Sequence, residues 1–406
     1  MPMNAPFLQR LLDYPRFKAP PYRIILLDSG YFTVAECKKG LEKLGHKVVL
    51  LSLGEDFIKR LLLILVEVKP DFLLTINHLG FDVEGKLTSL LTGLHLPYAS
   101  WFVDSPAYIL YKDHRQVSDF CSLFCWEKSY LRRMEETGFN SPVFLPLATD
   151  PDTFRPMDSP ALPQFSADIA FVGNSMTDAN SKWESKVQPG TMHEFSAKAL
   201  AGQFAEKSKP MGEILVELGA EGDAAGFIDI EAAMVWKATQ ECRKQLASHL
   251  LPLGLVIYGD TGWESLLTGK RELRPAVDYY RELPLVYNFT TVNVNSTSFQ
   301  MNSALNQRVF DCAAAGGFLL TDRQADMDSF FEPGKNAVCY DSPEEAVDLA
   351  GYYLKHDTER KSIAHAARER VLAGHTYDRR MAELVSSMAG KFGSNKQGAL
   401  RAAVGD

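Results

Sequence analysis

The sequence predicts an α/β protein made of two Rossmann-like domains, and three observations lead to this expectation. Short apolar runs of strand length alternate with longer segments of helical periodicity, which is typical of parallel sheets covered by helices. The alternation occurs twice, on either side of a proline-rich region at residues 142–163. The length of 406 residues is also sufficient for two domains that each bury a core.

The N-terminal half opens with an apolar strand at residues 23–28, an amphipathic helix at 34–44 that Gly45 ends, and a second strand at 46–51. Further strands are expected at 71–76, 97–103, 118–126 and 143–147, because each is a short apolar run. Helical periodicity places helices at 57–68 and 128–137. We expect these elements to form one parallel sheet with covering helices.

Polar residues follow several of these strands at the carboxyl end, where parallel sheets bind ligands. Ser29 and Gly30 follow the first strand, and we interpret them as a loop at the cleft between the domains. His78 follows the third strand and Asp104 the fourth. Both are candidate catalytic residues, with Asp104 as a base or as a ligand of a substrate hydroxyl. The alternatives are an ordinary turn at Ser29–Gly30, a structural histidine, and an aspartate that caps a helix.

The C-terminal half restarts with a strand at residues 168–172, followed by Gly173 and Asn174. Residues 176–250 are mostly of helical pattern, and we interpret them as a helical insertion. Further strands are predicted at 255–258, 292–294, 318–321 and 338–340. Helices are predicted at 279–283, 303–315, 325–331, 343–355, 357–373 and 376–388. Ser342 and Pro343 provide a strong start signal for the helix at 343–355.

The strand, helix and strand within residues 293–322 form a βαβ unit. Asn302 or Ser303 is expected to N-cap the helix, whose free N–H groups and positive dipole end suit a phosphate group. Asn302, Asn306 and Arg308 lie in the first turns, where such an anion would bind. The alternative is that Arg308 only pairs with Asp311, three residues later.

Several motifs resemble the CgeB-like, or spore-maturation-protein-like, glycosyltransferases. They are WFVDSP around Asp104, LNQRVFDCAAAGGFLLTD at residues 305–322, and the closing HTYDRRM. The C-terminal half also resembles glycosyltransferase family 4, in which a Glu-x7-Glu pair lies on the corresponding helix. Asp311 takes the second position of that pair, where the family binds the nucleotide ribose, and Ser303 takes the first.

The resemblance implies the GT-B architecture, with two facing Rossmann-like domains and a central cleft. It also implies transfer of a sugar from a nucleotide-diphosphate sugar to an acceptor hydroxyl, without a metal or another cofactor. The donor, with UDP favoured before GDP or TDP, would bind Gly173, Asn174, Tyr258 and Gly259 together with the residues on the helix at 303–315. The acceptor, a glycan, a protein or a small molecule, would bind the N-terminal domain near Ser29 and Gly30.

The predicted organisation is therefore an acceptor domain at residues 1–163 and a nucleotide-sugar domain at 164–375. A last helix at 376–392 is expected to cross back to the N-terminal domain and to precede a flexible tail at 393–406. The alternatives in function are a two-lobed small-molecule binding protein and a sugar-nucleotide epimerase of the same fold.

Composition narrows the class of protein further. The net charge of −8 argues against a nucleic-acid partner, which usually requires a basic stripe. The six cysteines form no CxxC pair, so no metal site is predicted, and scattered buried thiols fit a cytoplasmic location. We find neither a signal peptide nor an apolar run long enough to span a membrane.

Overall fold

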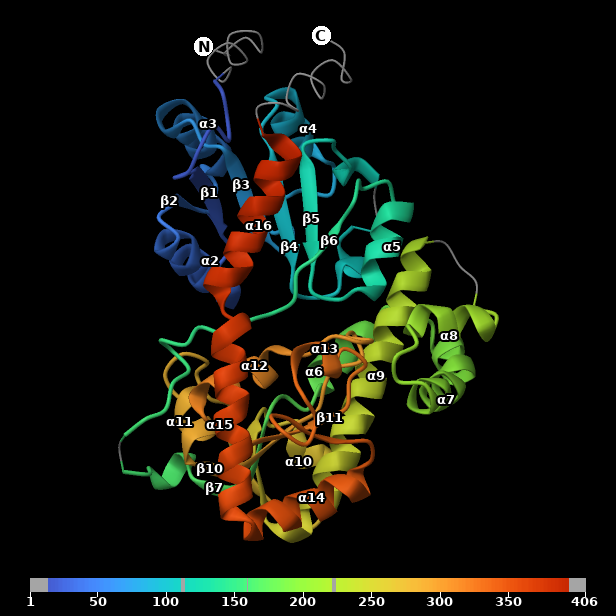
Figure 1. Cartoon of the computed structure of the whole chain (residues 1–406). Coiled ribbons are helices and arrows are strands. Elements are labelled where there is room, and N and C mark those ends of the chain that lie inside the picture. Colours follow the sequence, from blue (N-terminus) through green and yellow to red (C-terminus); the bar gives the residue numbers. More distant parts are fainter. Residues whose placement is uncertain (1–13, 111–113, 159, 221–223, 394–406) are drawn as a thin grey trace. The chain divides into compact units, whose positions relative to one another are not determined.

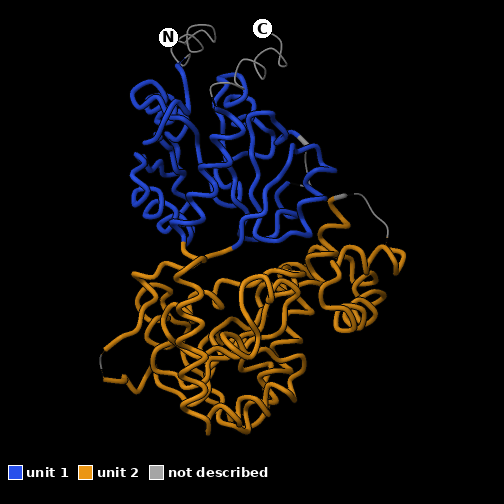
Figure 2. The backbone as a smooth tube through the Cα atoms, in the orientation of Figure 1, with its two compact units in different colours: residues 1–146, 377–406 blue, residues 147–376 orange. Residues whose placement is uncertain are grey.

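The computed structural model describes residues 14–110, 114–158, 160–220 and 224–393. The chain forms two compact units, residues 1–146 with 377–406 and residues 147–376 (Figure 2). The first unit ends before the predicted boundary at residue 163, because the following segment bonds within the second unit. Thr149 pairs with Thr376, and the Met157 N–H donates to Asn288 Oδ1 (2.8 Å). Of the predicted tail, residues 394–406 lie outside the described residues.

The first unit contains a parallel six-stranded sheet in the order β2-β1-β3-β4-β5-β6 (Figure 1). Its strands are β1 (Arg23–Asp28), β2 (Lys47–Ser52), β3 (Phe72–Ile76), β4 (Tyr98–Phe102), β5 (Cys121–Cys125) and β6 (Val143–Phe144). Every residue of β3, β4 and β5 is buried, as the continuous apolar runs predict. The strand order reverses between β1 and β3, and such a switch point is where sheets of this kind bind ligands.

The helices of this unit include one from the far end of the chain. They are α2 (Phe32–Lys43), α3 (Phe57–Val68), α4 (Lys86–Gly93), α5 (Ser129–Glu136) and α16 (Tyr377–Phe392), with short 3-10 turns η1 (Pro106–Tyr108) and η2 (His114–Gln116). The C-terminal α16 packs on α2, where Gly40 allows close approach. A Cβ at Gly40 would lie 3.1 Å from both Met381 Cγ and the Tyr377 carbonyl oxygen.

The second unit also contains a parallel six-stranded sheet, in the order β12-β11-β10-β7-β8-β9. Its strands are β7 (Ala167–Val172), β8 (Leu255–Gly259), β9 (Glu272–Pro275), β10 (Thr290–Asn295), β11 (Leu319–Asp322) and β12 (Val338–Tyr340). Numbered within the unit, this is the Rossmann order 3-2-1-4-5-6 read from the other edge. Its switch point lies between the neighbouring strands β7 and β10.

A helical segment follows β7 and has its own core. It consists of α6 (Thr177–Glu184), α7 (Pro189–Ala205), α8 (Met211–Glu217) and α9 (Ala224–Leu250), which ends in the turn η4 (Leu251–Leu253). Met234 and Ala238 of α9 belong to the core of the helical segment, whereas Leu246 and Leu250 of the same helix pack in the core of the sheet. The long helix α9 thus ties the helical segment to the sheet.

The remaining elements of the second unit are η3 (Pro163–Phe165), α10 (Trp263–Leu266), α11 (Leu283–Phe289), α12 (Gln307–Ala315), α13 (Met327–Phe330), α14 (Pro343–Lys355) and α15 (Asp357–Gly374). Ser342 caps α14 as predicted, accepting a hydrogen bond from the Glu345 N–H. None of the helices in the described ranges is both long and apolar enough to cross a membrane.

Two predictions of local structure were wrong, and one edge strand was missed. Helix α12 begins at Gln307 rather than at residue 303, because Ser303 bonds instead to Asp326 through both its carbonyl oxygen and its hydroxyl. The helix expected at 279–283 lies later, as α11. Strand β9 was missed because this exposed edge strand, ELRP, has no apolar alternation.

Candidate functional site

The switch point of the second unit brings Gly173 and Arg308 together. Gly173 directly follows β7, and Arg308 lies in the first turn of α12, which follows β10 and its loop. The Arg308 Nη2 atom lies 3.5 Å from the position that a Cβ at Gly173 would take. Because glycine has no side chain, the guanidinium comes close to the backbone at the end of β7. Two residues of the predicted donor site, which come from distant segments of the sequence, are therefore neighbours in the fold.

Arg308 is half-buried, and it forms no hydrogen bond or ion pair with any residue that the structure describes. The alternative interpretation, in which Arg308 only pairs with Asp311, is therefore wrong. A half-buried guanidinium without a protein partner retains all five of its N–H donors for a ligand. The planar fork of these donors matches the oxygens of a phosphate group.

Arg243, on α9, is a second arginine at this site, and the sequence analysis missed it. It is 4% exposed, and its Nη1 donates to the carbonyl oxygen of Asn174 (2.8 Å), which fixes the loop after β7. Its Nε has no partner among the described residues. Burial, together with the positive charge of Arg308, lowers the pKa of Arg243 to about 9. The two guanidinium groups therefore repel one another, and an anion between them would relieve that repulsion.

A sequence signal for Arg243 exists in its helical position. Thr239, Leu246 and Leu250 are spaced to lie on the same side of α9 as Arg243, and all three are buried. A charged residue on the buried face of a helix requires a partner, and such residues are candidates for functional sites.

Asn306 is the N-cap residue of α12, but its side chain does not cap the helix. Its Nδ2 donates to Asn295 Oδ1 (2.9 Å), and Asn295 Nδ2 donates to Thr321 Oγ1 (2.9 Å). The predicted phosphate donor of Asn306 is thus already bonded within the protein. Asn302 is 5% exposed and lies in the loop before the helix, not at its N-cap. The first turn of α12 contains no acidic residue, so its N–H groups remain favourable for an anion.

Asp311 is fully buried in the interior of the second unit. Its Oδ1 accepts hydrogen bonds from Thr149 Oγ1 (2.7 Å) and Gln307 Nε2 (3.1 Å), and its Oδ2 accepts one from the Tyr279 hydroxyl (2.8 Å). The predicted contact with a ribose does not fit this arrangement. Asp311 has no exposed surface, so a ribose hydroxyl would reach it only if the surrounding side chains moved.

Tyr258 and Gly259 have structural roles at the end of β8. The Tyr258 hydroxyl is bonded to the Gln164 carbonyl oxygen (3.1 Å) and to Arg274 Nη1 (2.5 Å), so it points away from the switch point. A Cβ at Gly259 would lie 2.7 Å from Trp263 Nε1, which donates to the Gly173 carbonyl oxygen (2.9 Å). Gly259 therefore supports the position of Gly173.

In the first unit, Asp104 lies at the end of β4 within a polar cluster. It is half-buried, and its Oδ2 accepts hydrogen bonds from the Tyr31 hydroxyl and from Asn77 Nδ2 (3.0 Å). Asn77 Oδ1 in turn accepts from the backbone N–H groups of Val103 (2.8 Å) and Asp104 (3.1 Å). Burial and the negative charge of Asp104 raise the pKa of Tyr31. The carboxylate is thus held rigidly at the switch point of the first sheet.

His78 does not fit the predicted catalytic role. It is 3% exposed, and its ring stacks on Phe81 with 4.1 Å between the ring centroids. Burial lowers the pKa of His78 to about 4, so it is neutral near pH 7. Asn77 and His78 both have positive φ angles, of 51° and 57°. Such backbone strain is stored where the surrounding structure requires it, and here the turn directs Asn77 toward Asp104.

Ser29 and Gly30 lie at the other strand of the same switch point. Gly30 has a φ angle of 72°, and its N–H donates to Asp28 Oδ1 (3.2 Å). The Ser29 hydroxyl oxygen is buried without a partner in the described part of the chain. Because β1 and β3 are neighbours, the loop after β1 belongs to the same end of the sheet as Asn77.

Within residues 14–110, 114–158, 160–220 and 224–393, no three His, Cys, Asp or Glu side chains are grouped so that they could hold a metal ion. The six cysteines are all free thiols. The charged groups near Arg243 include Arg308 and the carboxylates of Asp260 and Asp322.

Comparison with known proteins identifies the domain that contains this site. Residues 239–386 match the family model described as glycosyl transferase-like. No curated protein matches the sequence. Arg243, Arg308 and most of the second sheet thus lie within the matched segment.

Several solved structures have a similar fold. A glycosyltransferase from Rickettsia africae has a TM-score of 0.52 at 10% identity, covering 93% of this chain and 100% of that chain. Sucrose-phosphate synthase from Thermosynechococcus elongatus has a TM-score of 0.52 at 10% identity, covering 91% and 99%. Anabaena HepE, solved in complex with UDP and glucose, has a TM-score of 0.50 at 8% identity, covering 91% and 100%.

These identities are low, so the similarity concerns the fold. The narrower resemblance to the CgeB-like group stays a prediction. The chain has the α/β architecture of the GT-B glycosyltransferases, and residues 239–386 match a glycosyl transferase-like family model.

Proposed function

We propose that this protein transfers a sugar from a nucleotide-diphosphate sugar to an acceptor hydroxyl, and that no metal ion is needed. The observation that carries this proposal is the pair of arginines at the switch point of the second unit. Arg308 has no partner among the described residues, and Arg243 is buried beside the loop at Gly173 and Asn174. A diphosphate is the ligand group that two guanidinium groups and a helix N-terminus would bind best.

The arrangement also suits the chemistry of sugar transfer. The acceptor oxygen forms a bond to the anomeric carbon, and the bond from that carbon to the phosphate oxygen breaks. The electron pair leaves with the nucleoside diphosphate, whose negative charge increases as the bond breaks. Arg308, Arg243 and the N-terminal end of α12 would stabilise that charge. Stabilisation of the leaving group by arginines replaces the role that a metal ion has in other transferases.

We further propose that Asp104 binds the acceptor hydroxyl and takes its proton. Its Oδ2 is held by Tyr31 and Asn77, so the carboxylate has a fixed orientation at the end of β4. Because the base is already positioned, less entropy is lost when the transition state forms. The acceptor would be a glycan, a protein or a small molecule that offers a free hydroxyl.

A UDP-sugar is the favoured donor, before GDP- and TDP-sugars. The support is the fold of Anabaena HepE, which was solved in complex with UDP and glucose. The free thiols of all six cysteines fit a cytoplasmic enzyme, where nucleotide sugars are also available.

The test is a set of calorimetric titrations with UDP and with uridine. Arg308→Ala should weaken UDP binding by roughly 10- to 100-fold, which corresponds to about 1.5–3 kcal/mol for hydrogen bonds to a charged group. Uridine, which has no phosphate, should be affected by less than about twofold. Arg308→Lys should restore only part of the UDP affinity, because an ammonium group cannot form the bidentate contact.

Arg271→Ala is a matched control, because Arg271 is an exposed arginine of the same unit and its removal changes the net charge equally. Equal losses for UDP and uridine in Arg308→Ala, or no loss for either, would show that the phosphates do not bind at Arg308. If UDP, GDP and TDP all fail to bind the unmodified protein, the proposed donor class is wrong.

A further inference from the structure

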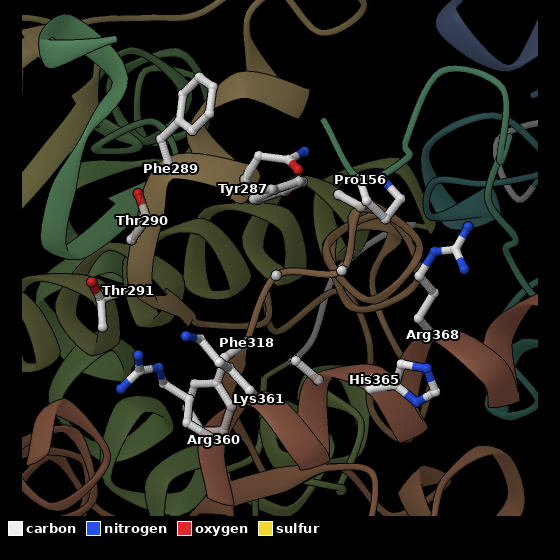
Figure 3. Close-up of a pocket in the computed structure, with 15 residues that line it drawn as sticks. Pro156, Tyr287, Phe289, Thr290, Thr291, Phe318, Arg360, Lys361, His365 and Arg368 are labelled. Atoms are coloured by element: carbon white, nitrogen blue, oxygen red, sulfur yellow. The ribbon is translucent and has the colours of Figure 1, made fainter. Parts of the chain in front are cut away.

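Figure 3 shows a pocket in the second unit. By the bounds of the strands, this pocket lies at the opposite end of the sheet from Gly173. Its volume is about 430 Å³, within the range of small-molecule sites. The lining includes Thr290, the first residue of β10, and Gly316–Gly317, the turn between α12 and β11. Both mark the amino ends of the strands, whereas the donor site lies at their carboxyl ends. The pocket is therefore separate from the proposed nucleotide site.

Two glycines keep the floor of the pocket open. Gly316 has a φ angle of 79° and ends α12 in the left-handed conformation. A Cβ at Gly317 would lie 2.6 Å from the Tyr287 carbonyl oxygen, so only glycine fits there. A Cβ at Gly316 would lie 3.3 Å from Pro156 Cγ and 3.9 Å from Arg368 Cδ, so the missing side chain at Gly316 leaves space between this turn and α15.

The C-terminal end of α12, which carries partial negative charge, is already capped at this point. The Gly316 N–H donates to the Ala313 carbonyl oxygen, and the Gly317 N–H donates to that of Cys312 (both 3.0 Å). Arg368 Nε donates to the Ala314 carbonyl oxygen (3.1 Å). These bonds satisfy carbonyl groups that would otherwise repel an anion in the pocket.

One side of the pocket is cationic. Figure 3 shows four α15 side chains along this side, namely Arg360, Lys361, His365 and Arg368, and Tyr287 and Pro156 along the other. Asp357 is the carboxylate that pairs with both Arg360 and Lys361, at 2.8 Å from the Lys361 Nζ. Arg368 forms no ion pair within the described ranges. His365 pairs with a second carboxylate, that of Glu369 (3.7 Å). Three permanent cations thus lie near two carboxylates, so the local charge of this side is positive.

We propose that this pocket binds a small molecule through a phosphate monoester group. A phosphate monoester carries a charge of about −1.5 to −2 near pH 7, which matches the local excess of positive charge. Its oxygens accept hydrogen bonds from guanidinium and ammonium donors, and α15 offers both in Arg360, Lys361 and Arg368. The remaining volume accommodates the rest of a molecule the size of a sugar phosphate. The proposal does not depend on the donor site, because it rests on α15 rather than on Arg308.

The experiment uses the full chain carrying Arg308→Ala, which weakens phosphate binding at the donor site. Calorimetry with glucose 6-phosphate, inorganic phosphate and glucose separates the contributions of ester, phosphate and sugar. We expect both phosphate compounds to bind and glucose not to bind. Adding Lys361→Gln should weaken both phosphate compounds by about tenfold or more, the effect of losing one charge-assisted contact.

The matched control is Lys355→Gln, which removes one exposed positive charge at the end of α14 and should leave binding unchanged. Arg368→Gln should also weaken binding. If the loss of the Arg368 contact to α12 disturbs folding, Lys361→Gln still tests the proposal, because Lys361 is exposed and its replacement should not affect folding. The proposal is overturned if no phosphate compound binds, if glucose binds as tightly as glucose 6-phosphate, or if Lys361→Gln and Lys355→Gln behave alike.

Discussion

Replacing Asp311 distinguishes a carboxylate that supports the fold from one that contacts the ligand. Asp311 is fully buried and accepts hydrogen bonds from Thr149, Gln307 and Tyr279 at 2.7–3.1 Å. These three donors come from the segment before β7, from α12 and from the loop before α11. The carboxylate therefore holds together parts of the second unit that are distant in the sequence.

The magnitude follows from these contacts. Asp311→Ala removes three bonds to a charged group, each worth about 1.5–3 kcal/mol, but it also removes the penalty for burying the charge. Breaking a buried network of this kind typically reduces the free energy of unfolding by about 3–5 kcal/mol. Asp311→Asn should have a smaller effect, of about 1–3 kcal/mol. The hydroxyls of Thr149 and Tyr279 can rotate to accept a hydrogen bond from the new amide N–H, whereas the Gln307 amide N–H can only donate.

The assay is chemical denaturation followed by circular dichroism, with Asp348→Ala as the control. Asp348 is an exposed aspartate on α14, so its loss should change the free energy of unfolding by less than about 0.5 kcal/mol. Calorimetry with UDP and 2′-deoxy-UDP completes the test. The structural role is refuted if Asp311→Asn is as stable as the control and no longer distinguishes the two nucleotides, while the unmodified protein does. That result would instead support a contact between Asp311 and the ribose.

Two further predictions concern the first unit. Burial lowers the pKa of His78 to about 4 from its ordinary value of 6.5. Between pH 4 and pH 6.5 the unfolded chain therefore binds more protons than the folded protein. The free energy of unfolding should fall by up to about 3 kcal/mol as the pH drops from 6.5 to 4. His78→Phe should flatten that part of the pH profile measured by denaturation, and an unchanged profile would mean that His78 does not titrate in this way. Asp104→Asn should lower turnover by about 100-fold or more, as expected for loss of a general base, while UDP affinity stays within about twofold. Normal turnover with reduced thermal stability would instead identify Asp104 as a structural partner of Tyr31 and Asn77.

The sequence alone determined the order of elements and the ends of most strands. Continuous apolar runs such as residues 71–76 become fully buried strands, because a strand in a covered parallel sheet is apolar on both faces. It also indicated Gly173 and Arg308 correctly as residues at the ends of elements. It did not reveal β9, an exposed edge strand whose polar residues carry no periodic signal.

Only the tertiary structure decided which of these residues form a site. Pairing of β7 with β10 brings Gly173 beside Arg308, and neither residue has a local signal for that contact. Arg243 joins them from α9, and Asp311, on the same helix as Arg308, is turned into the interior instead. Local patterns record the period of each element, but the direction in which a side chain points depends on how neighbouring elements pack against it. That packing is a property of the whole unit, and it separates the arginine available to a ligand from the aspartate that supports the fold.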